Sequence, residues 1–221
     1  MERGTLEQIS DGKIYDINDM VEAGTGGCNG CSACCHSVGD LVILTPFDVH
    51  TISTHQGQSF DELLDVSIEL REKNKIFLPH LKMQGDKERC SFLNEEGRCS
   101  IHPARPNICR LFPLGRIYEK DSFKYFLQLG SCPKPKLSKV QVREWIDITD
   151  YDQNKALILA WHGFIKALTF RLKFVRDEQE LGQINAYLLD TFYRIPLEEQ
   201  QDFYTVFFKH LPEAKNHLGI I

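Results

Sequence analysis

Four cysteines lie within eight residues of this chain, in the stretch CNGCSACC from Cys28 to Cys35. Thiolates are soft ligands, and several of them so close together are typical of sites for zinc or for an iron–sulfur cluster. The first three are spaced C-x2-C-x2-C, as in the bacterial ferredoxin motif, and the distant Cys132 precedes a proline as a cysteine of that motif does. Zinc sites also use C-x2-C pairs, so the spacing leaves both metals open.

The chain contains eight cysteines, and none of them lies after residue 132. They are Cys28, Cys31, Cys34, Cys35, Cys90, Cys99, Cys109 and Cys132. In a reducing compartment so many cysteines indicate metal binding or redox chemistry before disulfides. Because one zinc ion takes four ligands, eight thiols favour more than one metal atom, in two four-sulfur sites or in one cluster with some cysteines unused. Any one of them, Cys109 or Cys132 above all, can instead be a small buried hydrophobic residue.

The adjacency of Cys34 and Cys35 constrains how the first four thiols are used. If the segment after the glycine-rich GTGG forms a helix, positions 28, 31, 34 and 35 fall within an arc of about 120° on one face. Neighbouring residues in a helix diverge by about 100°. We therefore predict that Cys34 and Cys35 bind different atoms of a cluster, or two separate centres.

Composition and charge exclude several function classes. The chain has 221 residues, of which 42% are hydrophobic, and a formal net charge of -5. This charge provides no global basic field, so we expect neither nucleic acid nor a membrane surface as a partner. The N-terminal residues do not resemble a signal peptide, and no apolar stretch reaches the roughly 20 residues that span a bilayer. We therefore expect a soluble, cytoplasmic protein.

Capping and turn residues predict the elements that must position the cysteines. Thr45 is the expected N-cap of a helix that begins with Pro46, and Ser59 with Glu62 forms a capping box for a second helix over SFDELLDVSIEL. Residues 90–101 are expected to form a hairpin that brings its two cysteines together, and residues 115–129 a second hairpin.

From residue 138 onward the apolar spacing becomes helical, which predicts three or four amphipathic helices. The expected fold is mainly α with one or two small β-hairpins. It comprises a metal-binding cysteine-cluster domain over residues 1–137 and a helical extension over residues 138–221. The extension packs on the cysteine-bearing part, on itself, or on a partner protein or peptide, and the sequence leaves these three open.

Two arginines and two histidines lie close to cysteines. They are candidates for supporting the metal ligands or for binding an anion. Arg105 and Arg110 flank Cys109, where a guanidinium can offset the charge of a thiolate-bound centre or bind an anion. The alternative is that they lie on the surface of a short helix. His36 and His102 are expected to support the ligands rather than to replace a cysteine, because eight thiols already supply them. No catalytic residue can be named.

Three stretches of the chain resemble one known family. CNGCSACC, LTPFD and CSFLNEEGRCSIHPARPNICRLFP look like the YkgJ-type cysteine-cluster family, the CxxCxxCC proteins, which are described as zinc- or iron-chelating domains. The resemblance covers Cys28 to Cys132 and implies that all eight cysteines belong to the metal-site set. Pro106, Arg110 and Pro113, with Arg105, match its other motif positions.

The resemblance leaves three functions open. The first is an iron–sulfur protein, with a 4Fe–4S cluster expected, that acts in redox, cluster handling or the modification of a partner protein. The second is a zinc-stapled interaction module. The third is a protein lysine N-methyltransferase, because the flagellin methylase joins a similar cysteine cluster to S-adenosylmethionine-dependent chemistry. The chain lacks a G-x-G-x-x-G loop and the C-x3-C-x2-C spacing of radical S-adenosylmethionine enzymes. If the protein is an enzyme, the two classes that we consider are a methyltransferase and an oxidoreductase.

Overall fold

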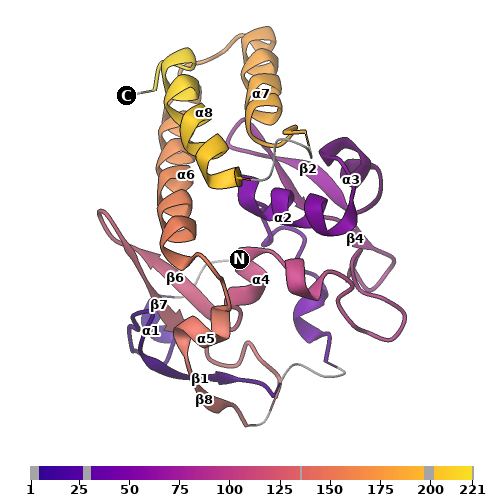
Figure 1. Cartoon of the computed structure of the whole chain (residues 1–221), viewed down its shortest axis with the longest axis vertical. Helices are drawn as coiled ribbons and strands as arrows, with labels where there is room; N and C mark the ends of the chain where they lie inside the picture. The colour runs from indigo at the N-terminus through magenta and orange to yellow at the C-terminus, as the bar shows by residue number, and fades with distance from the viewer. Residues whose placement is uncertain (1–4, 27–30, 135, 197–201, 221) are drawn as a thin grey trace.

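A computed structural model describes residues 5–26, 31–134, 136–196 and 202–220. Helices make up 44% and strands 20% of the structure, so the fold is mixed α/β rather than mainly α. Within the described residues the strands form four separate antiparallel pairs, where one or two hairpins were expected. Figure 1 shows the C-terminal helices at the upper end of the molecule and two of the strand pairs at the lower end, with another strand pair beside the helices.

The lower strand-rich part in Figure 1 joins the two ends of the cysteine-bearing segment. After the short helix α1 (Leu6–Ile9), strand β1 (Met20–Gly24) pairs antiparallel with β8 (Ser138–Gln141). The expected hairpin over residues 115–129 is confirmed as β6 (Leu114–Tyr118) and β7 (Phe123–Leu127). Helix α5 (Val142–Ile146) covers them, and its first and last residues belong to the same buried cluster as Val21 and Tyr125.

Two capped helices and a hairpin follow the first cysteines. Thr45 caps α2 (Pro46–Gln56), and Ser59 caps α3 (Phe60–Val66), as predicted. The second helix is shorter than expected, because the chain turns into β2 (Ile68–Lys73), which pairs with β3 (Ile76–Leu81). Both residues of the connecting turn, Asn74 and Lys75, have positive φ angles of 54° and 66°, the conformation of a tight hairpin turn.

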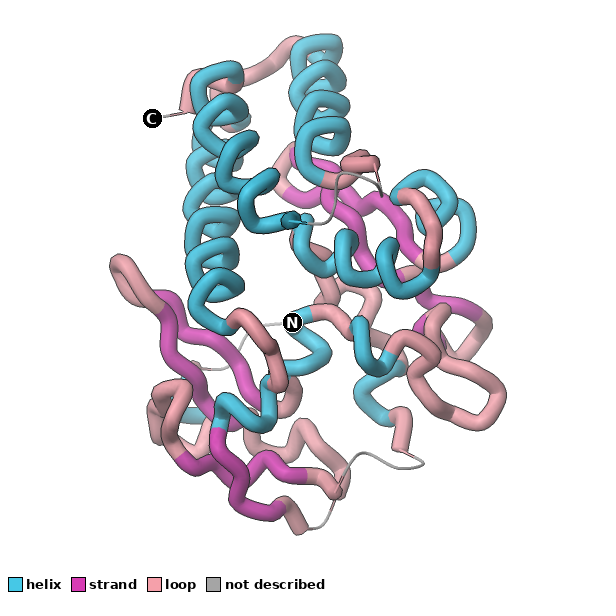
Figure 2. Tube along the Cα trace, in the orientation of Figure 1, coloured by secondary structure: helices cyan, strands magenta, loops and turns pink. Residues whose placement is uncertain are grey.

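Short elements carry the chain between the cysteines. A single 3-10 turn, η1 (Ala33–Cys35), precedes α2, and the two-residue strands β4 (Met83–Gln84) and β5 (Arg89–Cys90) pair with each other. The turn η2 (His102–Ala104) leads into the short helix α4 (Asn107–Leu111). Figure 2 shows these elements as brief helical and strand segments set in long loops.

The C-terminal helices pack on the cysteine-bearing part and on one another. They are α6 (Tyr151–Leu172), α7 (Glu178–Phe192) and α8 (Phe203–His217). The ring of Trp161 in α6 lies 5.1 Å from that of Phe192 in α7 and 6.3 Å from that of Phe207 in α8. The same buried cluster extends to residues of α2 and of the β2–β3 hairpin, and Tyr193 donates a hydrogen bond to the Leu44 carbonyl at 3.1 Å.

Among the described helices, none combines the length and the apolar character that crossing a bilayer requires.

Candidate metal centre

Seven cysteines line one cavity of about 400 Å³, which we call the cysteine cavity. They are Cys31, Cys34, Cys35, Cys90, Cys99, Cys109 and Cys132. The fold therefore brings together every predicted thiol that the structure describes, from four separate stretches of the chain. The eighth, Cys28, lies outside the described residues. No disulfide joins any of the seven.

The first stretch does not form the expected helix in its described part. Cys31 and Ser32 are not helical, and only Ala33–Cys35 make a 3-10 turn. The Ser32 carbonyl accepts hydrogen bonds from the Cys35 backbone N–H at 2.9 Å and from the His36 ring nitrogen Nδ1 at 2.9 Å. His36 thus braces the turn and does not line the cavity in the described structure.

The second stretch is a tight turn between Cys90 and Cys99. Its hydrogen bonds are those of a hairpin, from Asn94 N–H to the Arg98 carbonyl at 2.8 Å and from Ser100 N–H to the Phe92 carbonyl at 2.7 Å. Regular strands are not formed across it, because Cys90 pairs with Met83 instead. The predicted closeness of the two cysteines is nevertheless present, since both line the same cavity.

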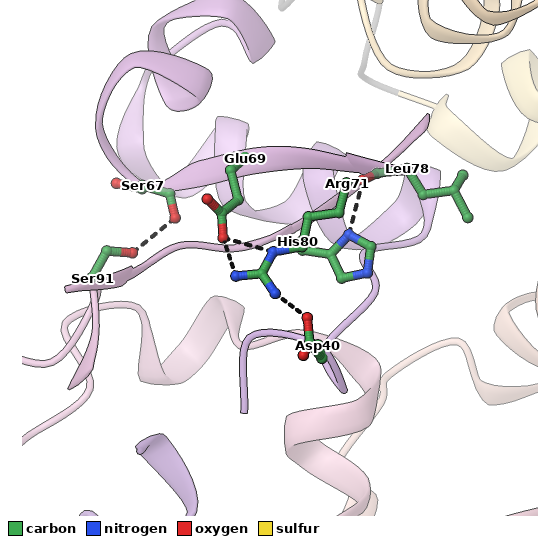
Figure 3. Close-up of polar contacts among 7 residues, drawn as sticks. All are labelled: Asp40, Ser67, Glu69, Arg71, Leu78, His80 and Ser91. Carbon is green, nitrogen blue, oxygen red and sulfur yellow. Dashed lines mark hydrogen bonds and ion pairs between the residues drawn. The ribbon is translucent and has the colours of Figure 1, made fainter. Parts of the chain in front are cut away.

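Strand β2 and the residue before it tie the first two stretches to the core. Arg71 of β2 forms an ion pair with Asp40, five residues after Cys35, and another with Glu69 on its own strand. Ser91, next to Cys90, donates at 2.8 Å to the carbonyl of Ser67, which ends α3 and directly precedes β2. Figure 3 shows both contacts beside the hydrogen bond between His80 Nδ1 and the Leu78 carbonyl.

The third stretch is α4, which is held in place by a buried carboxylate. Asp48 caps α2 by accepting from the Thr45 N–H at 2.8 Å and hydroxyl at 2.7 Å. Its second oxygen accepts from the Asn107 N–H at 2.7 Å and from Asn107 Nδ2 at 3.0 Å. Asp48 therefore fixes the start of the helix that carries Cys109. Burial raises the pKa of Asp48, and these hydrogen bonds oppose the rise.

Cys132 comes from the loop that follows β7. Two residues farther on, Lys134 donates to the Thr25 carbonyl at 2.8 Å, which ties this loop to the end of β1. Both Lys134 and Thr25 line the cavity. The loop that carries Cys132 is therefore held beside the β1–β8 pair.

The thiols differ strongly in acidity. Burial raises the pKa of Cys109 well above its ordinary value and that of Cys90 to about 11. A hydrogen bond from Cys35 lowers the pKa of Cys34 to about 6, and the charge of Arg105 acts in the same direction. Because metal ions bind thiolates, loading this cavity releases protons chiefly from the buried thiols.

The charged side chains that line the cavity are all basic. They are Arg98, Arg105 and Lys134, and none of the described lining residues is Asp or Glu. Arg105 also donates to His102 Nε2 at 2.7 Å, so His102, which lines the cavity, is held as an acceptor. Arg110 points elsewhere: it donates to the carbonyls of Asp147 at 3.0 Å, Arg105 at 3.2 Å and Pro103.

The thiols surround the cavity rather than converge on a point. In the described part of the chain, no three His, Cys, Asp or Glu side chains are spaced to hold one metal ion. The volume of the cavity is within the range of ligand pockets and far above that of a single water. The donor set therefore fits a thiolate-bound group, and its spread fits one with more than one metal atom.

Residues 27–133 match the model of the family CxxCxxCC, "Putative zinc- or iron-chelating domain". This part of the chain, 107 of its 221 residues, is similar to the CxxCxxCC family. The matched segment contains all eight cysteines and all the elements of the site from η1 to Cys132. Searches of curated proteins and of solved structures found no match to the chain.

Several residues of this site were not predicted from the sequence. Asp48 belongs to the capping box of α2, and its bonds to Asn107 join two segments 59 residues apart. Lys134 and Trp145 line the cavity with no motif to identify them. Only the proximity of Lys134 to Cys132 in the sequence could have suggested its role.

Proposed function

We propose that the cysteine cavity binds an iron–sulfur cluster, most simply of 4Fe–4S type. The observation that carries this proposal is that seven thiols from four stretches of chain line one cavity. A cluster is held by cysteine thiolates from separate segments, as these are. When bound, such a cluster supplies one-electron redox chemistry.

The spread of the thiols supports a cluster over one zinc ion. A structural zinc site and a 4Fe–4S cluster each take four ligands from the protein, so the number of thiols by itself does not separate them. In the described residues no three candidate ligands are set around one point, and the cavity has the volume of a larger group. The assignment of Cys34 and Cys35 to different metal atoms is kept as part of this proposal; both thiols line the cavity from η1 and are hydrogen-bonded to each other.

The lining also fits a group of net negative charge. Arg98, Arg105 and Lys134 are the charged residues of the described lining, and arginine beside a thiolate-bound centre offsets its charge. The charge of Arg105 already favours the thiolate forms of Cys34 and Cys99. A zinc ion bound by four thiolates is also anionic, so this argument supports thiolate ligation and not iron alone.

The mouth of the cavity suits a protein that exchanges electrons or clusters with a partner. Cys34 is exposed, and so are the apolar side chains of Leu41 and Ile108. Deeper in the cavity Cys90 and Phe92 are buried. The inner wall can therefore exclude water while one edge of a bound group stays within reach of another protein.

Anaerobic purification of the full chain with metal and sulfide analysis tests the proposal. We expect a brown protein that contains iron and acid-labile sulfide and that bleaches on reduction. A colourless protein with stoichiometric zinc and no sulfide would overturn the cluster and leave the zinc-stapled module in its place. A zinc-bound crystal structure with both Cys34 and Cys35 on one ion would contradict their assignment to different atoms.

Methyl transfer from S-adenosylmethionine rests on the family resemblance alone. Calorimetric titration of the metal-loaded protein with S-adenosylmethionine tests it separately. Binding would keep the methyltransferase alternative, and its absence would remove it without bearing on the cluster.

A further inference from the structure

A second hollow of about 410 Å³ lies beside the cysteine cavity, and we call it the polar cleft. Four parts of the chain line it: α2, the segment of residues 105–110, the link from α5 into α6, and the start of α8. Arg105 lines both hollows. Along the same segment Pro106, Ile108 and Cys109 line the cysteine cavity, whereas Asn107 and Arg110 line the cleft.

Carboxylates dominate the charged lining of the polar cleft. Asp48, Asp147, Asp150 and Asp202 all line it. Asp48 is fully engaged by Thr45 and Asn107, and Asp147 lies 3.9 Å from Arg110. Among the described residues, Asp150 and Asp202 have no cation within ion-pair distance. They remain as two acidic groups at the edge of the cleft.

A buried acceptor in the wall also has no partner. Asn107 is only 3% exposed, and its Nδ2 is committed to Asp48. Its Oδ1 forms no hydrogen bond within the described structure. A buried acceptor left unpaired costs about 1–3 kcal/mol, so its presence in the wall of a hollow indicates a donor that the protein itself does not provide.

Aromatic rings form one side of the cleft. The rings of Phe47 and Tyr204 are stacked at 5.2 Å, and those of His50 and Phe203 at 4.5 Å. All four residues line the cleft. Ring faces attract cations, and they also bury the alkyl part of an amphipathic ligand.

Two other ligand classes fit these observations less well. Helices α2, α6 and α8 begin at the cleft and would favour an anion, but Asp48, Asp150 and Asp202 already occupy their N-terminal positions. A divalent cation needs several oxygens around one point. In the described part of the chain no three carboxylate, thiol or imidazole side chains are so placed.

We propose that the polar cleft binds an alkylammonium group, with Asp150, Asp202 and the Asn107 Oδ1 as its acceptors and the aromatic rings against its alkyl chain. A primary ammonium provides three N–H donors, one for each of these three acceptor groups. Of the two arginines in the lining, Arg110 pairs with Asp147, and Arg105 donates to His102. The inference stands whichever metal the cysteine cavity holds.

Ligand-observed NMR titration of the metal-loaded full chain tests this inference with three probes of equal length: butylammonium, butyramide and butyrate. We expect butylammonium to bind, and the neutral and anionic probes to bind at least about tenfold more weakly. Butyrate that binds as well as butylammonium would overturn the proposal in favour of an anion site. Magnesium that displaces butylammonium at millimolar concentration would overturn it in favour of a metal site.

Matched substitutions locate the binding. Asp150→Asn and Asp202→Asn keep residues that cap helices well, and each is expected to weaken butylammonium binding about threefold, with about tenfold for the pair. Asp177→Asn is the control, because Asp177 caps α7 by accepting from Gln179 N–H at 2.8 Å and lies outside the cleft lining. Equal affinity in all variants would contradict the assignment. The metal content of each sample is measured as well. It shows whether a change in butylammonium affinity comes from the cleft or from loss of the metal.

Discussion

The cysteine cavity and the polar cleft are two hollows of similar volume that share one short wall, residues 105–110. The described lining of the first has seven thiols, three cations and no carboxylate. That of the second has four aspartates, and two arginines from the shared wall. A few residues of irregular chain and one turn of helix therefore separate soft ligands from hard ones.

This separation has a physical reason. A carboxylate beside the thiols would raise their pKa values and would offer oxygen to the metal in place of sulfur. In the shared wall, successive residues line different hollows: Asn107 lines the cleft, whereas Ile108 and Cys109 line the cavity. This arrangement requires that α4 keeps one rotation about its own axis. The hydrogen bonds of Asp48 to Asn107 at the start of α4 help to fix that rotation.

The largest effect is expected from removing thiols. Replacing Cys90 and Cys109 by serine should abolish metal binding, because both are ligand candidates that line the cavity from different stretches of the chain, Cys90 buried and Cys109 half-buried. Metal and sulfide analysis of the purified protein measures this. The pair Asp150→Asn and Asp202→Asn, on the other side of the wall, should retain the full metal content. Metal retained by the double serine variant would show that these two cysteines are only packing residues.

The next largest effect is expected from Asp48→Ala, which should disturb both hollows at once. The change leaves the buried N–H groups of Asn107 and Thr45 without an acceptor, at a cost of about 3 kcal/mol in the free energy of unfolding. Urea denaturation of the metal-free proteins measures the loss. Metal content and butylammonium affinity should both fall.

Asp65→Ala is the control for this change, because Asp65 is an exposed aspartate of the neighbouring helix α3. It should change the free energy of unfolding by no more than about 0.5 kcal/mol. If Asp48→Ala lowered metal content and left the cleft intact, the two hollows would not depend on one fixed wall.

Local signals made much of the fold predictable. The caps at Thr45 and Ser59, the hairpin of β6 and β7, and the amphipathic helices from α6 onward depend on residues close in sequence. The pairing of β1 with β8 does not, because its strands are more than a hundred residues apart. The β2–β3 hairpin was missed since Ile68 and Leu70 continue the helical spacing of Leu63.

The two hollows differ in the same way. The cysteine cavity could be predicted, because cysteine clusters carry their chemistry in residue type and spacing. The polar cleft could not, because each aspartate in it has an ordinary explanation at the start of its own helix. Only the packing of α2, α6 and α8 around residues 105–110 reveals that these helix starts face one hollow.

The smallest effects are expected from Arg105→Gln. This variant tests the comparison directly, because Arg105 lines both hollows. Loss of its charge should raise the pKa of Cys34 from about 6, since the guanidinium favours the thiolate. In metal-free protein, alkylation of Cys34 at pH 6 should then be slower, because a smaller fraction of the thiol is in the thiolate form. Peptide mass spectrometry after timed iodoacetamide treatment measures the rate of alkylation. In the cleft, butylammonium should bind about twofold more tightly, because a repelling cation is gone.

Arg98→Gln separates this effect from a general loss of positive charge. Arg98 lines the cysteine cavity and not the cleft, whereas Arg105 lines both and is one of the leading causes of the low pKa of Cys34. Arg98→Gln should therefore slow the alkylation of Cys34 less than Arg105→Gln does, and it should leave the affinity for butylammonium unchanged. Opposite changes on the two sides of the wall with Arg105→Gln alone would establish that one side chain sets the charge of both hollows. Equal changes with both variants would instead mean that the thiols and the cleft respond only to the net charge of the molecule, and that the wall does not separate them.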